Sequence, residues 1–154
     1  MALDGIKRMQ GAGKRRKPVT PGMLRRIRAK LAPRRSFDHA VLWATVRVAW
    51  FFLLRLSEYA VHDGGHRDPK KGLQGRDVVP SCAGQRVASF ALADEVVLTI
   101  RGSKTDVYNQ GETRNHFRSE DGELCIIKAL EELERHDPTL FKEDCTRYVC
   151  NWQG

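Results

Sequence analysis

Residues 51–58 read Phe-Phe-Leu-Leu-Arg-Leu-Ser-Glu and close a nearly unbroken apolar run that begins at Ala40. A run this wide predicts a buried helix that forms the centre of the core, from about residue 37 to residue 59. It is too short to span a bilayer, and it contains Arg47. No membrane partner is therefore expected.

The stretch also places an arginine on an apolar face. On a continuous helix Arg55 lies one turn beyond Phe51 and Phe52 and shares their side, and Glu58 is its neighbour three residues on. A surface ion pair at a helix end is the commoner explanation of such a pair. Two details argue against a surface ion pair. An arginine that precedes its glutamate forms the weaker orientation of a helical ion pair, and a carboxylate near a helix C-terminus opposes the helix dipole. A guanidinium beside apolar side chains is also costly unless an anion meets it, so we predict an anion-binding arginine.

The composition describes one soluble globular domain with an uneven charge. The chain has 154 residues, of which 41% are hydrophobic and 30% charged, and its net charge is +8. Residues 1–35 hold 12 Lys and Arg and one acid, whereas the remainder holds 15 basic and 18 acidic residues. No secretory leader is visible, and the four cysteines form no disulfide framework. We expect an intracellular location, and the nucleus if the source is eukaryotic.

The basic residues gather in an N-terminal arm. Residues 1–20 have the glycines and the charge of a flexible linker, and residues 21–154 are predicted to form the domain. Lys14, Arg15, Arg16 and Lys17 would neutralise phosphates along duplex DNA or act as a nuclear import signal. A solvated charge run without a partner explains them equally well.

Metal and cofactor sites are not expected. His62 and His66, and likewise Cys145 and Cys150, have spacings that suggest zinc, but they do not assemble into a familiar set of four ligands.

The remaining pattern predicts an α+β fold, mainly helical with a small antiparallel hairpin. A first helix starts at Thr20 and Pro21, a capping hydroxyl followed by a proline, and Pro33 ends it. A long loop follows the central helix. Strands are predicted at residues 76–79, 87–90, 95–101 and 113–118, and an amphipathic helix at 123–135.

Cations surround the predicted hairpin. Lys104 lies near the tip of its turn, and Arg101, Arg114 and Arg118 flank it. We take Arg25, Arg101 and Arg114 as candidate DNA contacts. Without Arg55 upstream, a turn lysine in solvent would be the better explanation of Lys104.

A helix, Arg-x-x-Glu, a hairpin with Lys-Thr at its turn and an amphipathic helix follow one another in an order that resembles the tyrosine recombinases, the phage-integrase-like family. The family's motif around its first catalytic arginine resembles residues 54–58, and the strand-turn that carries its catalytic lysine resembles residues 102–105. The segment that leads into its catalytic domain resembles residues 17–20, and its first short strand resembles residues 73–78. The amino-acid sequences of residues 57–59 and 102–111 are most similar to those of recombinases of eukaryotic Crypton-type mobile elements. The resemblance spans roughly residues 17–136.

The resemblance implies DNA recombination or integration on double-stranded DNA, carried out by DNA-bound oligomers. Arg55 corresponds to the first catalytic arginine, Glu58 to the acid that accompanies it and Lys104 to the catalytic lysine. An arginine fork stabilises charge on a transferring phosphoryl group, and a lysine would protonate the leaving 5′-oxygen.

The second half of the family's catalytic set is missing from this sequence. None of the five histidines is followed by arginine three places on, and no such box precedes Tyr148, which we do not assign as the nucleophile. We therefore expect a partial catalytic domain that by itself neither cleaves nor rejoins DNA, with some apolar surface of residues 40–56 uncovered. The alternative is a non-catalytic basic nucleic-acid-binding protein whose arm makes the contacts. A zinc-dependent interaction module is a third, weaker alternative.

Overall fold

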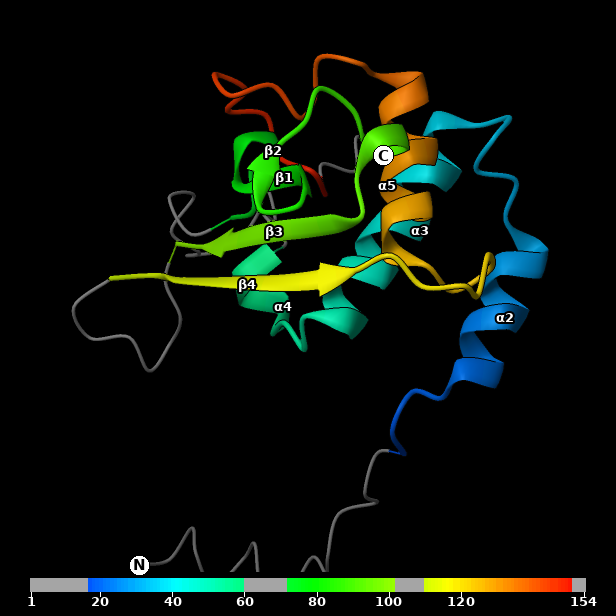
Figure 1. Cartoon of the computed structure of the whole chain (residues 1–154). Helices are drawn as coiled ribbons and strands as arrows, with labels where there is room; N and C mark the ends of the chain where they lie inside the picture. Colours follow the sequence, from blue (N-terminus) through cyan, green and yellow to red (C-terminus); the bar gives the residue numbers. More distant parts are fainter. Residues whose placement is uncertain (1–16, 60–71, 102–109, 151–154) are drawn as a thin grey trace, which may run out of the picture.

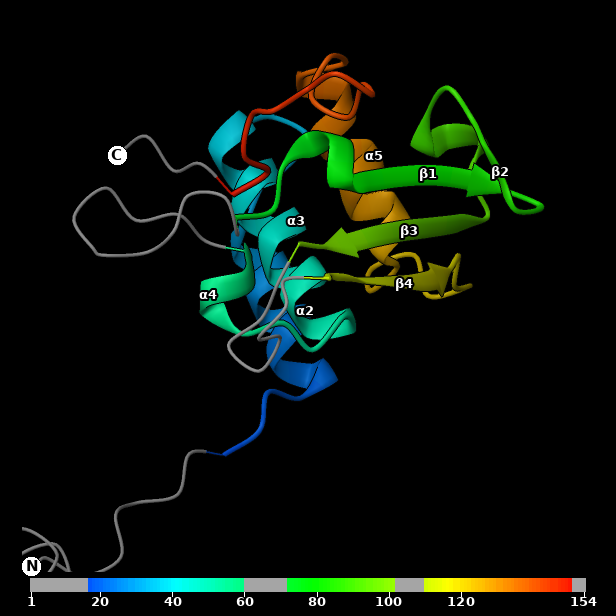
Figure 2. The same ribbon diagram turned by 90° about the vertical axis from the view of Figure 1, so that its left-hand side faces the viewer.

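Helices and an antiparallel sheet make up the computed structural model, which describes residues 17–59, 72–101 and 110–150 (Figures 1 and 2). The predicted α+β class is confirmed. The helices are α2 (Pro21–Lys30), α3 (Phe37–Phe51), the single turn α4 (Leu56–Tyr59) and α5 (Ile126–His136). The strands are β1 (Val78–Cys82), β2 (Gln85–Arg86), β3 (Glu95–Ile100) and β4 (Glu112–Phe117), and two 3-10 turns are η2 (Gly75–Asp77) and η3 (Phe90–Leu92).

Side-chain caps set the starts of the first two helices. Thr20 Oγ1 accepts a hydrogen bond from the backbone N–H of Met23 at 3.3 Å, and Pro21 follows at the first helical position, as predicted. Ser36 Oγ accepts from the N–H of His39 at 3.4 Å and begins α3. Helix α2 ends at Lys30, before the proline that was expected to end it.

The sheet has the order β2-β1-β3-β4, and every neighbouring pair is antiparallel. The predicted hairpin is confirmed, since β3 pairs with β4 and places Leu98 opposite Arg114. The predicted strand at 87–90 is wrong. Ser89 caps the turn η3 there, and Phe90 enters the core.

Two predicted elements start later than expected. The turn η2 occupies the first two positions of the predicted strand 76–79, so β1 begins at Val78. Helix α5 begins at Ile126 because the carboxylate of Asp121 accepts from the N–H groups of Glu123 and Leu124, both at 3.0 Å, and holds a turn there.

Helix α3 lies between two apolar clusters. The larger cluster joins Val48 of α3 to the inner side chains of α5, β1 and β3, and the smaller one joins Trp43 to Leu24 of α2 and to Leu124 and Ala129. Helix α2 accordingly lies on the far side of α3 and α5 from the sheet (Figure 1). Trp43 is buried in the core.

The C-terminal segment, residues 137–150, packs against residues 73–76 just before the sheet. The N–H of Gly75 donates to the carbonyl of Arg147 at 2.8 Å, and the N–H of Val149 donates to that of Leu73 at 3.0 Å. A Cβ atom on Gly75 would lie 1.6 Å from the carbonyl oxygen of Leu140, so only glycine fits.

Candidate nucleic-acid interface

The helix that carries the apolar run ends earlier than the sequence predicts. Helix α3 stops at Phe51, and Leu53 adopts a left-handed conformation with φ 53°. The N–H of Leu54 then donates to the carbonyl of Ala49 at 3.0 Å, which is the hydrogen bond of a Schellman termination. The prediction of one helix from 37 to 59 is therefore wrong.

The break changes the surroundings of Arg55. The sequence predicted that its side chain lies on the apolar face of a continuous helix. In the structure the side chain is 57% exposed, in the corner between α3 and α4. Leu53 and Leu56 beside it are also exposed. The buried side chains of α3 are covered by α2, α5 and the sheet, so the exposed large apolar side chains within residues 40–56 are Leu53 and Leu56.

Glu58 holds the backbone of Arg55 more directly than its guanidinium. Its Oε2 accepts the backbone N–H of Arg55 at 2.9 Å, whereas the guanidinium Nη1 lies 3.9 Å from Oε1. The carboxylate belongs to the first turn of α4, where it satisfies an N–H that would otherwise lack a partner and where the helix dipole favours it. Two of the reasons drawn from the sequence for an anion-binding Arg55, an unfavourable helix dipole at Glu58 and apolar surroundings of the guanidinium, therefore do not hold in the structure.

Two side chains of β4 bind the last carbonyls of α3. Arg114 Nη1 donates to the oxygen of Phe52 at 2.9 Å, and the His116 ring nitrogen Nε2 donates to the oxygen of Phe51 at 2.7 Å. The other nitrogen of Arg114, Nη2, donates to Glu112 at 2.7 Å. This bond raises the pKa of Arg114 and lowers that of Glu112, and nearby Glu58 adds to the rise. A shallow groove of about 430 Å³ lies between these side chains and the end of α3.

The other predicted DNA contacts are spread over the molecule. Arg101 donates through Nε and Nη2 to buried Asp77 at 3.0 and 2.9 Å, and Arg25 lies 2.7 Å from Asp121. Lys17 is exposed. Four predicted residues lie outside the described residues: Lys14, Arg15, Arg16 and Lys104. The structure thus brings together Arg55, Glu58 and Arg114, and not the complete predicted set.

One notable residue, the buried cation Arg47, was not predicted from the sequence as a separate feature. Arg47 is fully buried in α3, between the aromatic rings of Trp43, Trp50 and Phe51, and its nitrogens have no hydrogen-bond partner among the described residues. Its position inside the apolar run is the one signal for it in the sequence.

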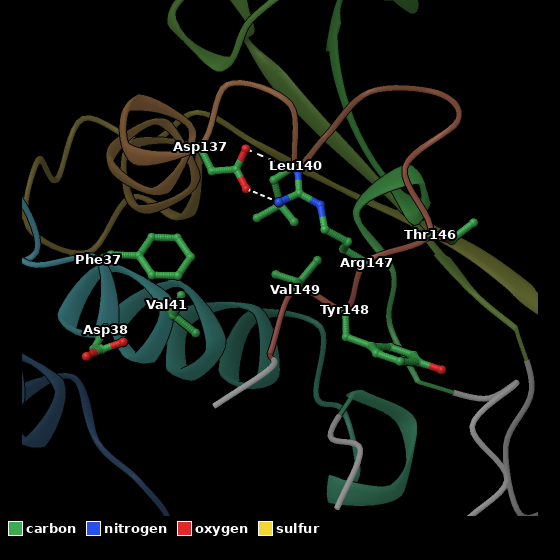
Figure 3. Close-up of a pocket in the computed structure, with 9 residues that line it drawn as sticks. All are labelled: Phe37, Asp38, Val41, Asp137, Leu140, Thr146, Arg147, Tyr148 and Val149. Carbon is green, nitrogen blue, oxygen red and sulfur yellow. Dashed lines mark hydrogen bonds and ion pairs between the residues drawn. The ribbon is translucent and has the colours of Figure 1, made fainter. Parts of the chain in front are cut away.

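A second cavity was also not foreseen. It measures about 590 Å³ and lies between the first turn of α3 and the C-terminal segment, with Val41, Leu140 and Val149 among its walls (Figure 3). Arg147 on its rim binds Asp137 and Thr139. Because Arg147 is already paired with these neighbouring residues, it does not indicate a ligand in this cavity.

No group of three or more metal-binding side chains is found in the described part of the chain, in which all four cysteines are free. His62 and His66 lie outside that part. None of the helices there is long and apolar enough to cross a membrane. No family model, curated protein or solved structure matches this chain.

Proposed function

We propose that this domain binds the phosphate backbone of double-stranded DNA at the corner between α3 and α4, as a partial tyrosine-recombinase domain, with Arg55 as the phosphate ligand. The observation that carries the proposal is the geometry of Arg55. Its backbone is held by Glu58, while its guanidinium extends into solvent, with one ion pair, at 3.9 Å, among the described residues. A planar, permanently charged fork on a fixed backbone suits a phosphate group.

The proposed chemistry stops at binding. In a complete recombinase of this class, Arg55 would stabilise charge on the scissile phosphate and Lys104 would protonate the leaving oxygen. The sequence offers no His-x-x-Arg box to complete the set. We expect no covalent adduct with a nicked suicide substrate. An adduct mapped to a tyrosine of this chain would contradict the proposal that it is catalytically incomplete.

Binding to a labelled duplex, measured by fluorescence anisotropy over a range of salt concentrations, tests the role of Arg55. Arg55→Ala should weaken binding about tenfold, or 1.4 kcal/mol, and reduce the salt slope by about 0.9, the loss of one phosphate contact. Arg26→Ala is the matched control, because it removes an exposed cation of α2 that has no ion pair among the described residues. Equal losses in the two variants would mean that only net charge matters.

The charge of the N-terminal arm favours a second candidate, a basic nucleic-acid-binding protein without a phosphate site. Deleting residues 1–16 tests it without removing Leu24, which is buried in the core. If the arm makes all the contacts, the deletion abolishes binding, and Arg55→Ala leaves the affinity and the salt slope of the full chain unchanged.

A further inference from the structure

Two side chains of one strand, β4, hydrogen-bond to the backbone at the corner that carries Arg55. Residues 112, 114 and 116 alternate along β4 and therefore point to one face. On that face Arg114 binds the carbonyl oxygen of Phe52, His116 binds that of Phe51, and the His116 ring lies edge-on to the ring of Phe52 at 4.9 Å. The last carbonyls of a helix lack partners within it, so these bonds hold the end of α3.

Arg114 is held at both ends of its guanidinium. One nitrogen donates to Phe52, the other donates to Glu112, and Glu58 is close enough to interact with its charge. A cation at the C-terminal end of a helix is also favoured by the helix dipole. Its hydrogen bonds are therefore directed at protein atoms, whereas the guanidinium of Arg55 extends outward.

We infer that Arg114 is a positioning residue, which fixes the corner between α3 and α4 so that Glu58 holds Arg55 in place, and that it is not itself a phosphate ligand. The consequence for DNA rests on the function proposed above. Arg114 was predicted from the sequence as a DNA contact, and the two roles give different results in experiments.

The first test needs no DNA. Hydrogen exchange of the Arg55 amide, followed by NMR, reports the bond from its N–H to Glu58. Arg114→Ala should speed this exchange at least about tenfold while the amides in the middle of α5 keep their protection. Arg86→Ala is the matched control, since it removes another arginine-to-carbonyl bond, to Phe141, elsewhere in the fold. Unchanged exchange in Arg114→Ala, or an equal effect of Arg86→Ala, would overturn the inference.

The second test is a double-mutant cycle in DNA binding. If Arg114 acts through Arg55, Arg114→Ala weakens binding in the intact protein and has no further effect once Arg55 is alanine. If Arg114 binds a phosphate itself, the two losses add and the salt slope falls by about 1.8 in the double variant, which would refute the inference.

The two tests also separate this inference from the proposed function. If the Arg55 amide is exposed in Arg114→Ala but Arg55→Ala binds DNA normally, Arg114 positions the corner and the phosphate site is wrong. If Arg55→Ala weakens binding and Arg114→Ala changes neither exchange nor binding, the phosphate site stands and the inference about Arg114 fails.

Discussion

The guanidinium of Arg47 lies 4.5 Å from the centre of the Phe51 ring, one helical turn further along α3, and its nitrogens have no hydrogen-bond partner among the described residues. The rings of Trp43 and Trp50 lie at 5.2 and 5.6 Å. Burial of this charge costs several kcal/mol, and cation–π contacts return up to about 2 kcal/mol each. Burial also lowers the pKa of Arg47 to about 10.

We predict that Arg47→Met raises the free energy of unfolding by about 1 kcal/mol, because methionine fills similar space without a charge. Arg47→Lys should lower it, since an ammonium is more strongly hydrated and stacks less well on rings. Urea denaturation measures both. The folded protein releases this proton near pH 10, and the unfolded chain does so only at a higher pH, so the gain in Arg47→Met is complete at neutral pH and shrinks above pH 10. A less stable Arg47→Met protein would show that the rings outweigh the cost of burial.

The left-handed backbone of Leu53 gives a second prediction. A side chain at φ 53° is strained, and Leu53 is 81% exposed, so it contributes little packing. Leu53→Gly should stabilise the protein by about 0.5–1 kcal/mol in thermal or urea unfolding. Leu53→Ala keeps the Cβ atom and should show no gain. A gain in the alanine variant as well would mean that exposure of the leucine, and not strain, is the cost.

Gly75 should not tolerate a side chain. Its Cβ would meet the backbone of Leu140 at 1.6 Å, which cannot move without displacing the C-terminal segment. We expect Gly75→Ala to cost more than about 3 kcal/mol. In Gly22→Ala, within α2, the new Cβ would lie 3.9 Å from Thr20 Oγ1, an ordinary contact, so this variant should be neutral or stabilise by up to about 1 kcal/mol. Equal stabilities of the two variants would contradict the packing of residues 140–147 against Gly75.

The pair of Asp137 and Arg147 predicts a dependence on pH. The hydrogen bond from Arg147, with a smaller effect of Thr139, holds the pKa of Asp137 below its ordinary value of 3.8. A depressed carboxyl pKa stabilises the fold above pH 3.8, and this contribution is lost as the pH falls through the lower folded value. Because Arg147 is half exposed, Asp137→Asn should cost only about 0.5–1 kcal/mol at pH 7. Urea denaturation at pH 7 and at pH 2.5 should show a difference that shrinks in acid. A constant difference would exclude the charge as its cause.

The local elements could be predicted from the sequence, and the long-range ones could not. Thr20 with Pro21 marks the start of α2, and the period of residues 95–100 marks β3, because both signals arise within a few residues. The break at Leu53 gives no such signal, since leucine rarely adopts a left-handed conformation and usually continues a helix. The pairing of Gly75 with Arg147 joins segments that carry no complementary pattern.

Of the candidate site, too, the sequence could predict the local contact and not the long-range one. The proximity of Arg55 and Glu58 follows from their spacing, and it survives although the helix that was expected to produce it is interrupted. The contact of Arg114 with Phe52 depends on where a distant strand lies, so the sequence showed its charge and not its partner.

The order of the sheet also bears on aggregation. An outermost strand is a template on which a strand of another molecule can add. Here the outer strand β2 has only two residues, and the outer strand β4 carries Glu112, Arg114 and His116. Short or charged edges disfavour such addition, so neither end of the sheet invites growth into a fibril. Self-association at high concentration should therefore start at exposed apolar side chains, of which Leu53 is the most exposed, and not by backbone pairing at the strand edges.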